Sequence, residues 1–182
     1  MTVAEYFATP ETVVPQELIY GVMRMAESPS TTHQEAVAAL FLAVHGHLKR
    51  TGEGTVWLAP LDVVLDAERA LVVQPDLLVT MPGGPAAVLD KIHGAPDLVI
   101  EVMSPNPRIG TVAERLGWFA TYGVRECWLV HPVPHEIEVW QFAGGGAGVR
   151  RVFGPDERIA SGVLPAFDQS PVEILGYPPG RV

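Results

Sequence analysis

Cysteine is almost absent from this sequence. Among 182 residues, Cys127 is the single cysteine, which excludes an intrachain disulfide and a cysteine-ligated zinc cluster. Cys127 lies between Glu126 and Trp128 in an apolar stretch. We therefore interpret it as a small buried hydrophobic residue and not as a nucleophile.

Long apolar runs are also lacking. No stretch approaches the roughly 20 apolar residues that a membrane-spanning helix needs. The beginning of the chain, Met1–Tyr6, has neither the basic flank nor the apolar core of a signal peptide. We therefore expect a cytoplasmic protein with no membrane partner.

Positive charge is scarce as well. The chain has 12 Lys and Arg against 21 Asp and Glu, which gives a formal net charge of −9. A protein that holds nucleic acid by its phosphates usually presents a basic face. The charge balance therefore argues against high-affinity nucleic-acid binding, because long-range attraction of DNA would be weak or repulsive. It does not exclude an enzyme whose acidic cluster is covered by metal ions.

Apolar residues, by contrast, are plentiful and make up 48% of the chain. This fraction and this length predict one folded domain over residues 1–182. Within it, residues 1–29 are expected to form an N-terminal strand and edge segment, and residues 177–182 a Pro-rich tail.

The spacing of apolar residues predicts two helices, at about 33–50 and 111–122, each with a glycine just beyond its end. Thr32 and Glu35 are spaced as a capping box for the first helix. Strands are expected at 56–65, 70–80, 98–103, 126–131 and 136–142, with a hairpin turn at 66–69 and a final strand pair before the tail. This order predicts an α/β fold with a mixed sheet.

Two acidic residues interrupt apolar strands. Glu101 lies within Leu98–Met103, and Asp76 lies within Val72–Val79. An ionised carboxylate in a buried strand is costly unless a metal or a cation pairs with it. Mg²⁺ and Mn²⁺ prefer oxygen ligands and usually need one or two carboxylates. The two acids therefore predict a divalent-metal site, with Arg115 of the second helix as a nearby cation for transition-state charge.

Three ordered motifs surround these residues: Gln74-Pro75-Asp76-Leu77-Leu78-Val79, then residues 94–105 (GAPDLVIEVMSP), then residues 114–130 (ERLGWFATYGVRECWLV). Together they resemble the Uma-type "putative restriction endonuclease" family of the PD-(D/E)XK nuclease superfamily. The likeness extends to residues 18–21 and His33 upstream and to residues 162–167 downstream, so it covers most of the chain.

The resemblance implies a restriction-endonuclease-like fold, with a central mixed β-sheet flanked by helices. It implies that Asp76 and Glu101 are catalytic metal-binding acids, that the cofactor is Mg²⁺ or Mn²⁺, and that DNA is the substrate. Met103 stands where the wider superfamily has its lysine, and the family places that lysine at the position of Arg115. Family members also often carry an Asp at the position of Thr111.

Arginine at position 115 keeps the positive charge, but it cannot release a proton and its fork differs in shape from an ammonium group. We therefore hypothesise a weakened or lost nuclease. Three further residues are expected to lie around the metal-binding acids and support them. The alternatives are that His33 caps the first helix, that Asp62 is a solvated strand-end acid and that Glu17 is an exposed edge residue.

The sequence thus predicts a Mg²⁺-dependent endonuclease with Asp76, Glu101 and Arg115 in its site. A homodimer is expected, because one small domain offers little surface to a duplex. One alternative is a catalytically inactive module for binding or assembly, in which Arg115 forms a structural bridge to Glu101. A second alternative is a hydrolase of a smaller phosphate ester.

Overall fold

The computed structural model describes residues 1–182 except 11, 13, 105–108, 145, 147 and 177–182. In the described part, two mixed sheets of six strands each are accompanied by four helices. This confirms the predicted α/β class, with two sheets in place of one. The predicted tail lies outside the described residues. No helix in the described part of the chain is both long enough and apolar enough to cross a bilayer.

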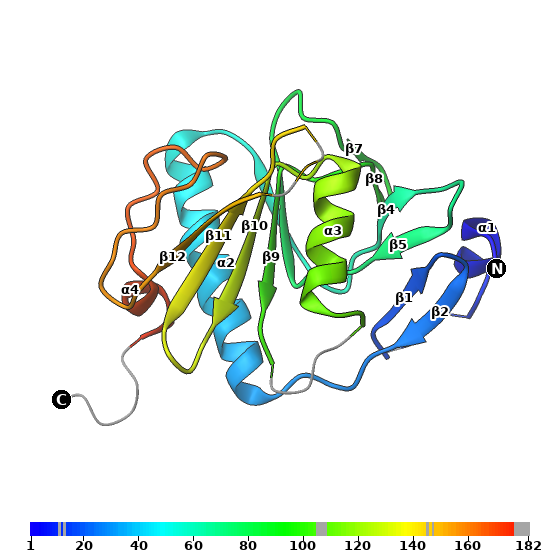
Figure 1. The fold of residues 1–182 in the computed structure, drawn as a ribbon, viewed down its shortest axis with the longest axis horizontal. Helices are drawn as coiled ribbons and strands as arrows, with labels where there is room; N and C mark the ends of the chain where they lie inside the picture. Colours follow the sequence, from blue (N-terminus) through cyan, green and yellow to red (C-terminus); the bar gives the residue numbers. More distant parts are fainter. Residues whose placement is uncertain (11, 13, 105–108, 145, 147, 177–182) are drawn as a thin grey trace.

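The strands of sheet A follow the order β2-β1-β5-β4-β8-β7, and those of sheet B follow the order β12-β11-β10-β9-β6-β3 (Figure 1). The strands of sheet A are β1 Gln16–Ile19, β2 Val22–Met25, β4 Val63–Asp66, β5 Leu71–Val73, β7 Ala87–Val88 and β8 Ile92–His93. Those of sheet B are β3 Thr55–Leu58, β6 Leu77–Thr80, β9 Leu98–Val102, β10 Glu126–His131, β11 Glu136–Gln141 and β12 Val149–Phe153. The helices are α1 Val3–Phe7, α2 Thr31–Thr51, α3 Val112–Tyr122 and α4 Pro171–Leu175.

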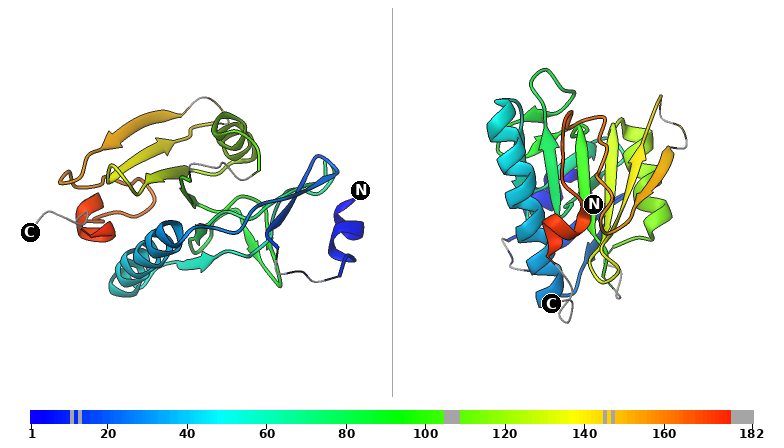
Figure 2. Two further views of the ribbon diagram at one scale, coloured as in Figure 1. Left: turned by 90° about the horizontal axis from the view of Figure 1, so that it is seen from below. Right: turned by 90° about the vertical axis from the view of Figure 1, so that its left-hand side faces the viewer.

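Helices α2 and α3 cover opposite faces of sheet B (Figure 2). Helix α2 buries Leu40, Val44 and Leu48 at helical spacing against one face. Helix α3 buries Trp118 and Phe119 in a second core, which it shares with the other face of sheet B and with sheet A. The site-bearing strand β9 therefore lies between two apolar layers, as the sequence predicted.

Local capping explains where the long helices begin and end. Ser30, the first of the three hydroxyl residues 30–32 that the sequence offers as N-caps, caps α2 by accepting a hydrogen bond from the His33 amide, so the predicted Thr32–Glu35 box lies two residues too late. Thr111 and Glu114 form a capping box at α3, and Gly123 ends that helix with a positive φ of 96°.

The two long strands predicted at 56–65 and 70–80 are each broken in the middle. Their outer parts, β3 and β6, pair in sheet B, while their inner parts, β4 and β5, form the hairpin in sheet A. Pro60 and Pro75 lie in the two breaks. Proline has no amide proton to donate to a ladder, so each of them favours an interruption of its strand. The hairpin therefore passes from one sheet to the other, and Asp76 stands at the crossing point just before β6.

The end of the chain also differs from the prediction. One strand, β12, pairs antiparallel with β11, where a final pair of strands was expected. The chain then continues without regular structure to α4, whose Ser170 cap forms a capping box with Glu173.

Candidate functional site

Strands β6 and β9 bring the two predicted metal-binding acids to neighbouring positions. The strands are antiparallel, with Leu77 opposite Ile100. Continuing this register by one residue brings Asp76 opposite Glu101. Both residues are buried, at 2% and 8% exposure. Two carboxylates thus share one end of a strand pair inside the protein.

Asp76 is held by the backbone of β9 and by the first turn of α2. Its Oδ2 atom accepts a hydrogen bond from the Val102 amide at 2.8 Å and lies 3.0 Å from Nε2 of His33. His33 is itself buried, and the cap at Ser30 fixes the helix turn that carries it. These contacts fix the orientation of the Asp76 carboxylate.

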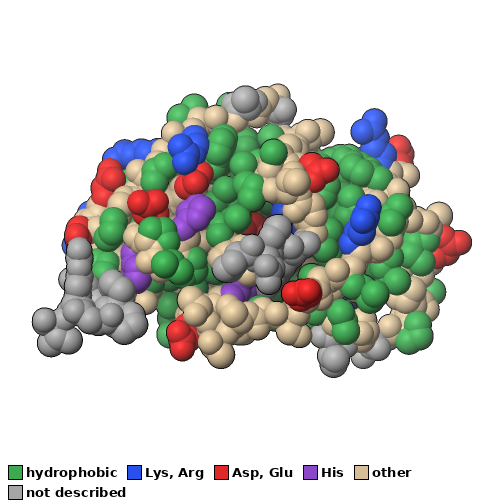
Figure 3. Space-filling view, turned by 60° about the horizontal axis from the view of Figure 1, so that its bottom comes forward, with side chains coloured by type: hydrophobic (Ala, Val, Ile, Leu, Met, Phe, Trp, Pro, Cys, Tyr) green, Lys and Arg blue, Asp and Glu red, His purple; other side chains and the backbone are tan. Residues whose placement is uncertain are grey.

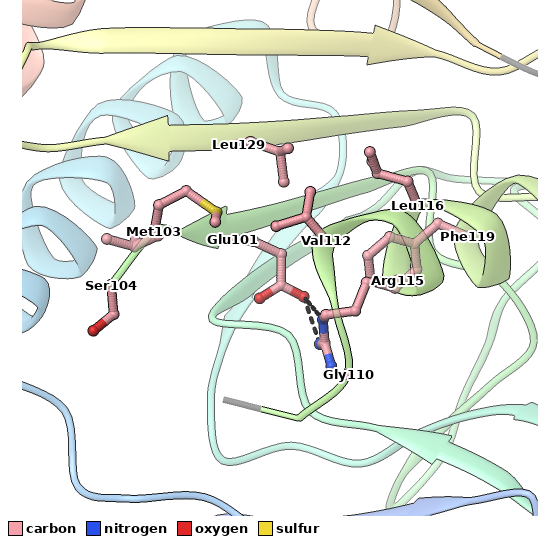
Figure 4. A pocket seen from close by; sticks show the side chains of 10 residues that line it. Glu101, Met103, Ser104, Gly110, Val112, Arg115, Leu116, Phe119 and Leu129 are labelled. Carbon is pink, nitrogen blue, oxygen red and sulfur yellow. Dashed lines mark hydrogen bonds and ion pairs between the residues drawn. The ribbon is translucent and has the colours of Figure 1, made fainter. Parts of the chain in front are cut away.

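Arg115 lies between two carboxylates from different sheets. From α3, its Nε and Nη2 atoms both donate to Oε1 of Glu101, the first at 3.0 Å (Figure 4). Its Nη1 atom donates to both oxygens of Glu17 on β1, at 3.1 and 2.8 Å, and to the carbonyl of Ile109. The guanidinium therefore connects sheet A to sheet B.

The charges in this cluster shift one another. The pKa of Glu101 is raised to about 7, because burial and the nearby charges of Asp76 and Glu17 together outweigh the lowering effect of Arg115. Burial acts to lower the pKa of Arg115, but the charges of Glu101 and Glu17 outweigh it and raise that pKa. Arg115 is therefore a permanent cation and not a proton acceptor.

The acidic pair fits a metal ion that keeps most of its water. In the described part of the chain, no cluster of three or more His, Cys, Asp or Glu could hold a metal. Arg115 binds Oε1 of Glu101, and no hydrogen bond to Oε2 is found among the described residues. Mg²⁺ and Mn²⁺ usually take one or two carboxylates from a protein and keep several waters, so two carboxylates suffice in number.

Residues 103 and 111 have local structural roles here. Met103 and Ser104 line a cavity of about 50 Å³ beside Glu101, and the Met103 side chain packs against the core shared by α3 and the sheets (Figure 4). Thr111 caps α3 through the Glu114 amide. Position 103 thus contributes no cation, and position 111 no carboxylate, to the site.

Glu17 and Asp62, the two acids predicted to support the metal-binding pair, lie in different places. Glu17 is buried at the site, where its carboxylate accepts a hydrogen bond from the backbone amide of Gln74 at 2.7 Å and others from Arg115. Asp62 bonds to Tyr6, Gln74 and Lys91 instead, at 3.2, 2.9 and 3.1 Å. Gln74 therefore links Asp62 to Glu17, while the hydrogen bonds of Asp62 go to neither Asp76 nor Glu101.

Sequence reasoning missed the pair of Glu17 and Arg115. A signal for it was present, because Glu17 is an acid in the otherwise apolar run Glu17-Leu18-Ile19, just as Glu101 is in its own strand. The partner could not be read from the sequence, since it lies 98 residues away.

Several surface arginines are paired with acids. Arg125 pairs with Asp97, Arg150 with Glu138 and Arg151 with Glu157, at 3.0, 2.7 and 2.7 Å respectively. Arg108 lies outside the described residues. On the face that Figure 3 draws, blue side chains are scattered and form no continuous band.

Comparison with known proteins places this geometry in context. A family model described as "Putative restriction endonuclease" and named Uma2 matches residues 3–173. A solved structure from Anabaena variabilis, titled a "putative nuclease belonging to DUF820", has 19% identity and a TM-score of 0.80, and the match covers 96% of this chain and 97% of that one. The likeness to that structure shows a shared fold. A search of curated proteins finds no match.

Proposed function

The chain belongs to the Uma2 family of restriction-endonuclease-like proteins, and from this premise we propose that it hydrolyses DNA phosphodiester bonds with the help of Mg²⁺ or Mn²⁺. Family membership and fold support a nuclease function. The observation that supports the metal-dependent mechanism is the register of β6 and β9, which brings the carboxylates of Asp76 and Glu101 to one strand end.

Each residue of the cluster has a proposed role. Asp76 and Glu101 would bind the ion, while the Val102 amide and His33 keep the Asp76 carboxylate in position. A bound ion would polarise the phosphate and lower the pKa of an attacking water. Arg115 is a positioning residue, because its donors hold Glu101 and Glu17. Its positive charge also offsets the developing negative charge of the phosphate.

A second candidate function is a binding or assembly module without catalysis. It is favoured by one observation: Arg115 already neutralises Glu101 and Glu17, so the cluster carries its own cation. In that case Arg115 serves as a structural bridge and no metal is required.

Calorimetric titration with Mn²⁺ separates the two functions. We expect wild-type protein to bind Mn²⁺, and the double variant Asp76→Ala with Glu101→Ala to lose that binding. A control with Glu53→Ala and Asp156→Ala removes the same charge from exposed positions and should bind as the wild type does. A folded wild-type protein that binds no Mn²⁺ would refute the nuclease mechanism and leave the module.

We also propose that the active form is a homodimer, because one small domain offers little surface to a DNA substrate. Sedimentation at working concentration should give twice the chain mass of 19.6 kDa. A stable monomer would contradict this assembly without affecting the proposed metal site.

A further inference from the structure

A mostly apolar groove opens beside Asp76, on the face opposite to Arg115. It has a volume of about 370 Å³ and runs between the first half of α2 and the end of β3. Phe41 and Leu42 line it from α2, and Leu58 lines it from β3. His33, Gln34 and Asp76 are its polar lining residues. This size and lining are typical of sites for small apolar groups with a few polar contacts.

The groove is continuous with the candidate metal site, because Asp76 belongs to both. Asp76 lies opposite Glu101 when the register of β6 and β9 is continued by one residue, and it also lines the groove beside His33. A phosphodiester held at the two acids would therefore carry its neighbouring nucleoside to the mouth of the groove.

An aromatic ring lines the groove. Phe41 is half-buried in the groove and stacks on His45, with ring centroids 5.3 Å apart and planes 15° from parallel. Base stacking on aromatic rings is tolerant of sequence and gives affinity without phosphate contacts. The exposed amide of Gln34 adds a donor and an acceptor for a base edge at the polar end.

Charge favours this mode of binding over one that follows the phosphates. The net charge is −9, and Arg125, Arg150 and Arg151 are each engaged by an acid. Phosphate contacts through these three arginines, of the kind that dominate affinity for duplex DNA, are therefore weakened. In a duplex the bases are stacked inside the helix, so only an unpaired base can enter the groove.

We propose, on the basis of the nuclease function above, that this groove is a subsite for an unpaired nucleobase next to the scissile phosphate. The preferred substrate is then single-stranded or locally unpaired DNA, since a fully paired duplex must first break a base pair.

The test is a binding measurement that does not depend on cleavage. Fluorescence titration without divalent metal would compare a single strand that contains 2-aminopurine with its duplex. We expect the single strand to bind about tenfold more tightly or better, since stacking of one base is worth about that factor. We expect the 2-aminopurine fluorescence to change as the base enters the groove. Equal affinity, or tighter binding of the duplex, would overturn the proposal.

Two variants and a matched control locate the binding. Leu42→Glu adds a charge at the groove wall, and Phe41→Leu removes the aromatic face while keeping apolar volume; each should weaken single-strand binding about tenfold. Leu89→Glu is the control, because Leu89 is as exposed as Leu42, at 69%, and does not line the groove. Unchanged binding by both groove variants would refute the subsite.

The outcomes also separate this proposal from the nuclease function. Mn²⁺-dependent cleavage of duplex with no preference for single strands would retain the nuclease and reject the subsite. Groove-dependent binding of single strands without Mn²⁺ binding would retain the subsite and reject the nuclease. A change of sedimentation in Leu42→Glu with unaltered DNA binding would assign the groove to contact between copies and overturn the proposal.

Discussion

Arg115 joins two acidic residues that come from distant parts of the chain. Its planar fork binds Glu101 with one side and Glu17 with the other. A lysine is a compact point charge and cannot bind both carboxylates in this way. The identity of the cation at position 115 therefore determines how freely Glu101 can bind anything else.

Replacing Arg115 by lysine should increase metal-dependent DNA cleavage by about tenfold or more, because a lysine leaves Glu101 more available and can take part in proton transfer. The same variant should be less stable by about 1.5 to 3 kcal/mol, the usual worth of a hydrogen bond to a charged group. Cleavage of a labelled oligonucleotide and urea unfolding measure the two effects. Arg125→Lys, at a surface pair, is the control. A folded Arg115→Lys protein with no gain in cleavage would refute the role assigned to Arg115.

Glu126 provides a second prediction at the residue scale. This buried carboxylate accepts hydrogen bonds from the Trp128 indole, the Ser161 hydroxyl, the Gly162 amide and the Gln141 amide group. Glu126→Gln keeps the shape but turns an NH₂ group toward these donors, so we expect a loss of about 1 to 3 kcal/mol in the free energy of unfolding. Urea unfolding measures it, and exposed Glu157→Gln should change little. Equal stability of the two variants would contradict a stabilising role for the Glu126 hydrogen bonds.

At the scale of elements, the sequence predicted the helices and strands whose apolar pattern is contained in one continuous segment. The two long helices and strands β9, β10 and β11 were predicted to within a few residues, because apolar periodicity and terminal glycines are local signals. The breaks at Pro60 and Pro75 were missed, since the apolar run continues on both sides of each break and only the packing of two sheets shows where the chain crosses.

The candidate site was likewise predictable only in those parts that have a local sequence signal. Asp76 and Glu101 stood out because they interrupt apolar strands, and their pairing follows from the register of β6 and β9. The link from Arg115 to Glu17 depends on the docking of sheet A against α3, which has no local signature. The groove along α2 was hidden for the same reason, because its walls come from two elements. The functional roles of these residues stay predictions.

The cap of α3 gives a prediction at this scale. The Thr111 hydroxyl accepts a hydrogen bond from the Glu114 amide, and this helix turn leads directly to Arg115. Thr111→Ala should reduce stability by about 1 kcal/mol, while Thr111→Ser should keep most of it, because serine supplies the same hydroxyl. Urea unfolding of the two variants provides the comparison. A Thr111→Ala protein as stable as Thr111→Ser would show that the cap contributes nothing.

At the scale of the whole molecule, the acidic charge determines how DNA binding responds to salt. Affinity for nucleic acid falls with salt in proportion to the number of phosphates that are neutralised. The arginines of the β10–β12 region are engaged by acids, so few phosphates should be contacted. The affinity for a single strand should therefore fall less than about tenfold between 50 and 200 mM salt, as about two contacts would give.

Fluorescence anisotropy at a series of salt concentrations measures this slope. A fall of a thousandfold or more over about the same range would indicate six or more phosphate contacts and would contradict the prediction. The Leu89→Glu protein again serves as the control, because it alters surface charge away from the groove.

The position of Arg115 between the sheets also affects how the molecule opens. Glu17 belongs to sheet A and Glu101 to sheet B, so the Arg115 guanidinium forms an ion pair with each of the two sheets. A ligand that binds Glu101 in place of Arg115 breaks the Arg115–Glu101 ion pair, and with it the link between sheets A and B through this arginine. Backbone amides of β1 would then exchange with deuterated solvent faster in the occupied protein than in the free one, which is the reverse of the protection that ligands usually confer.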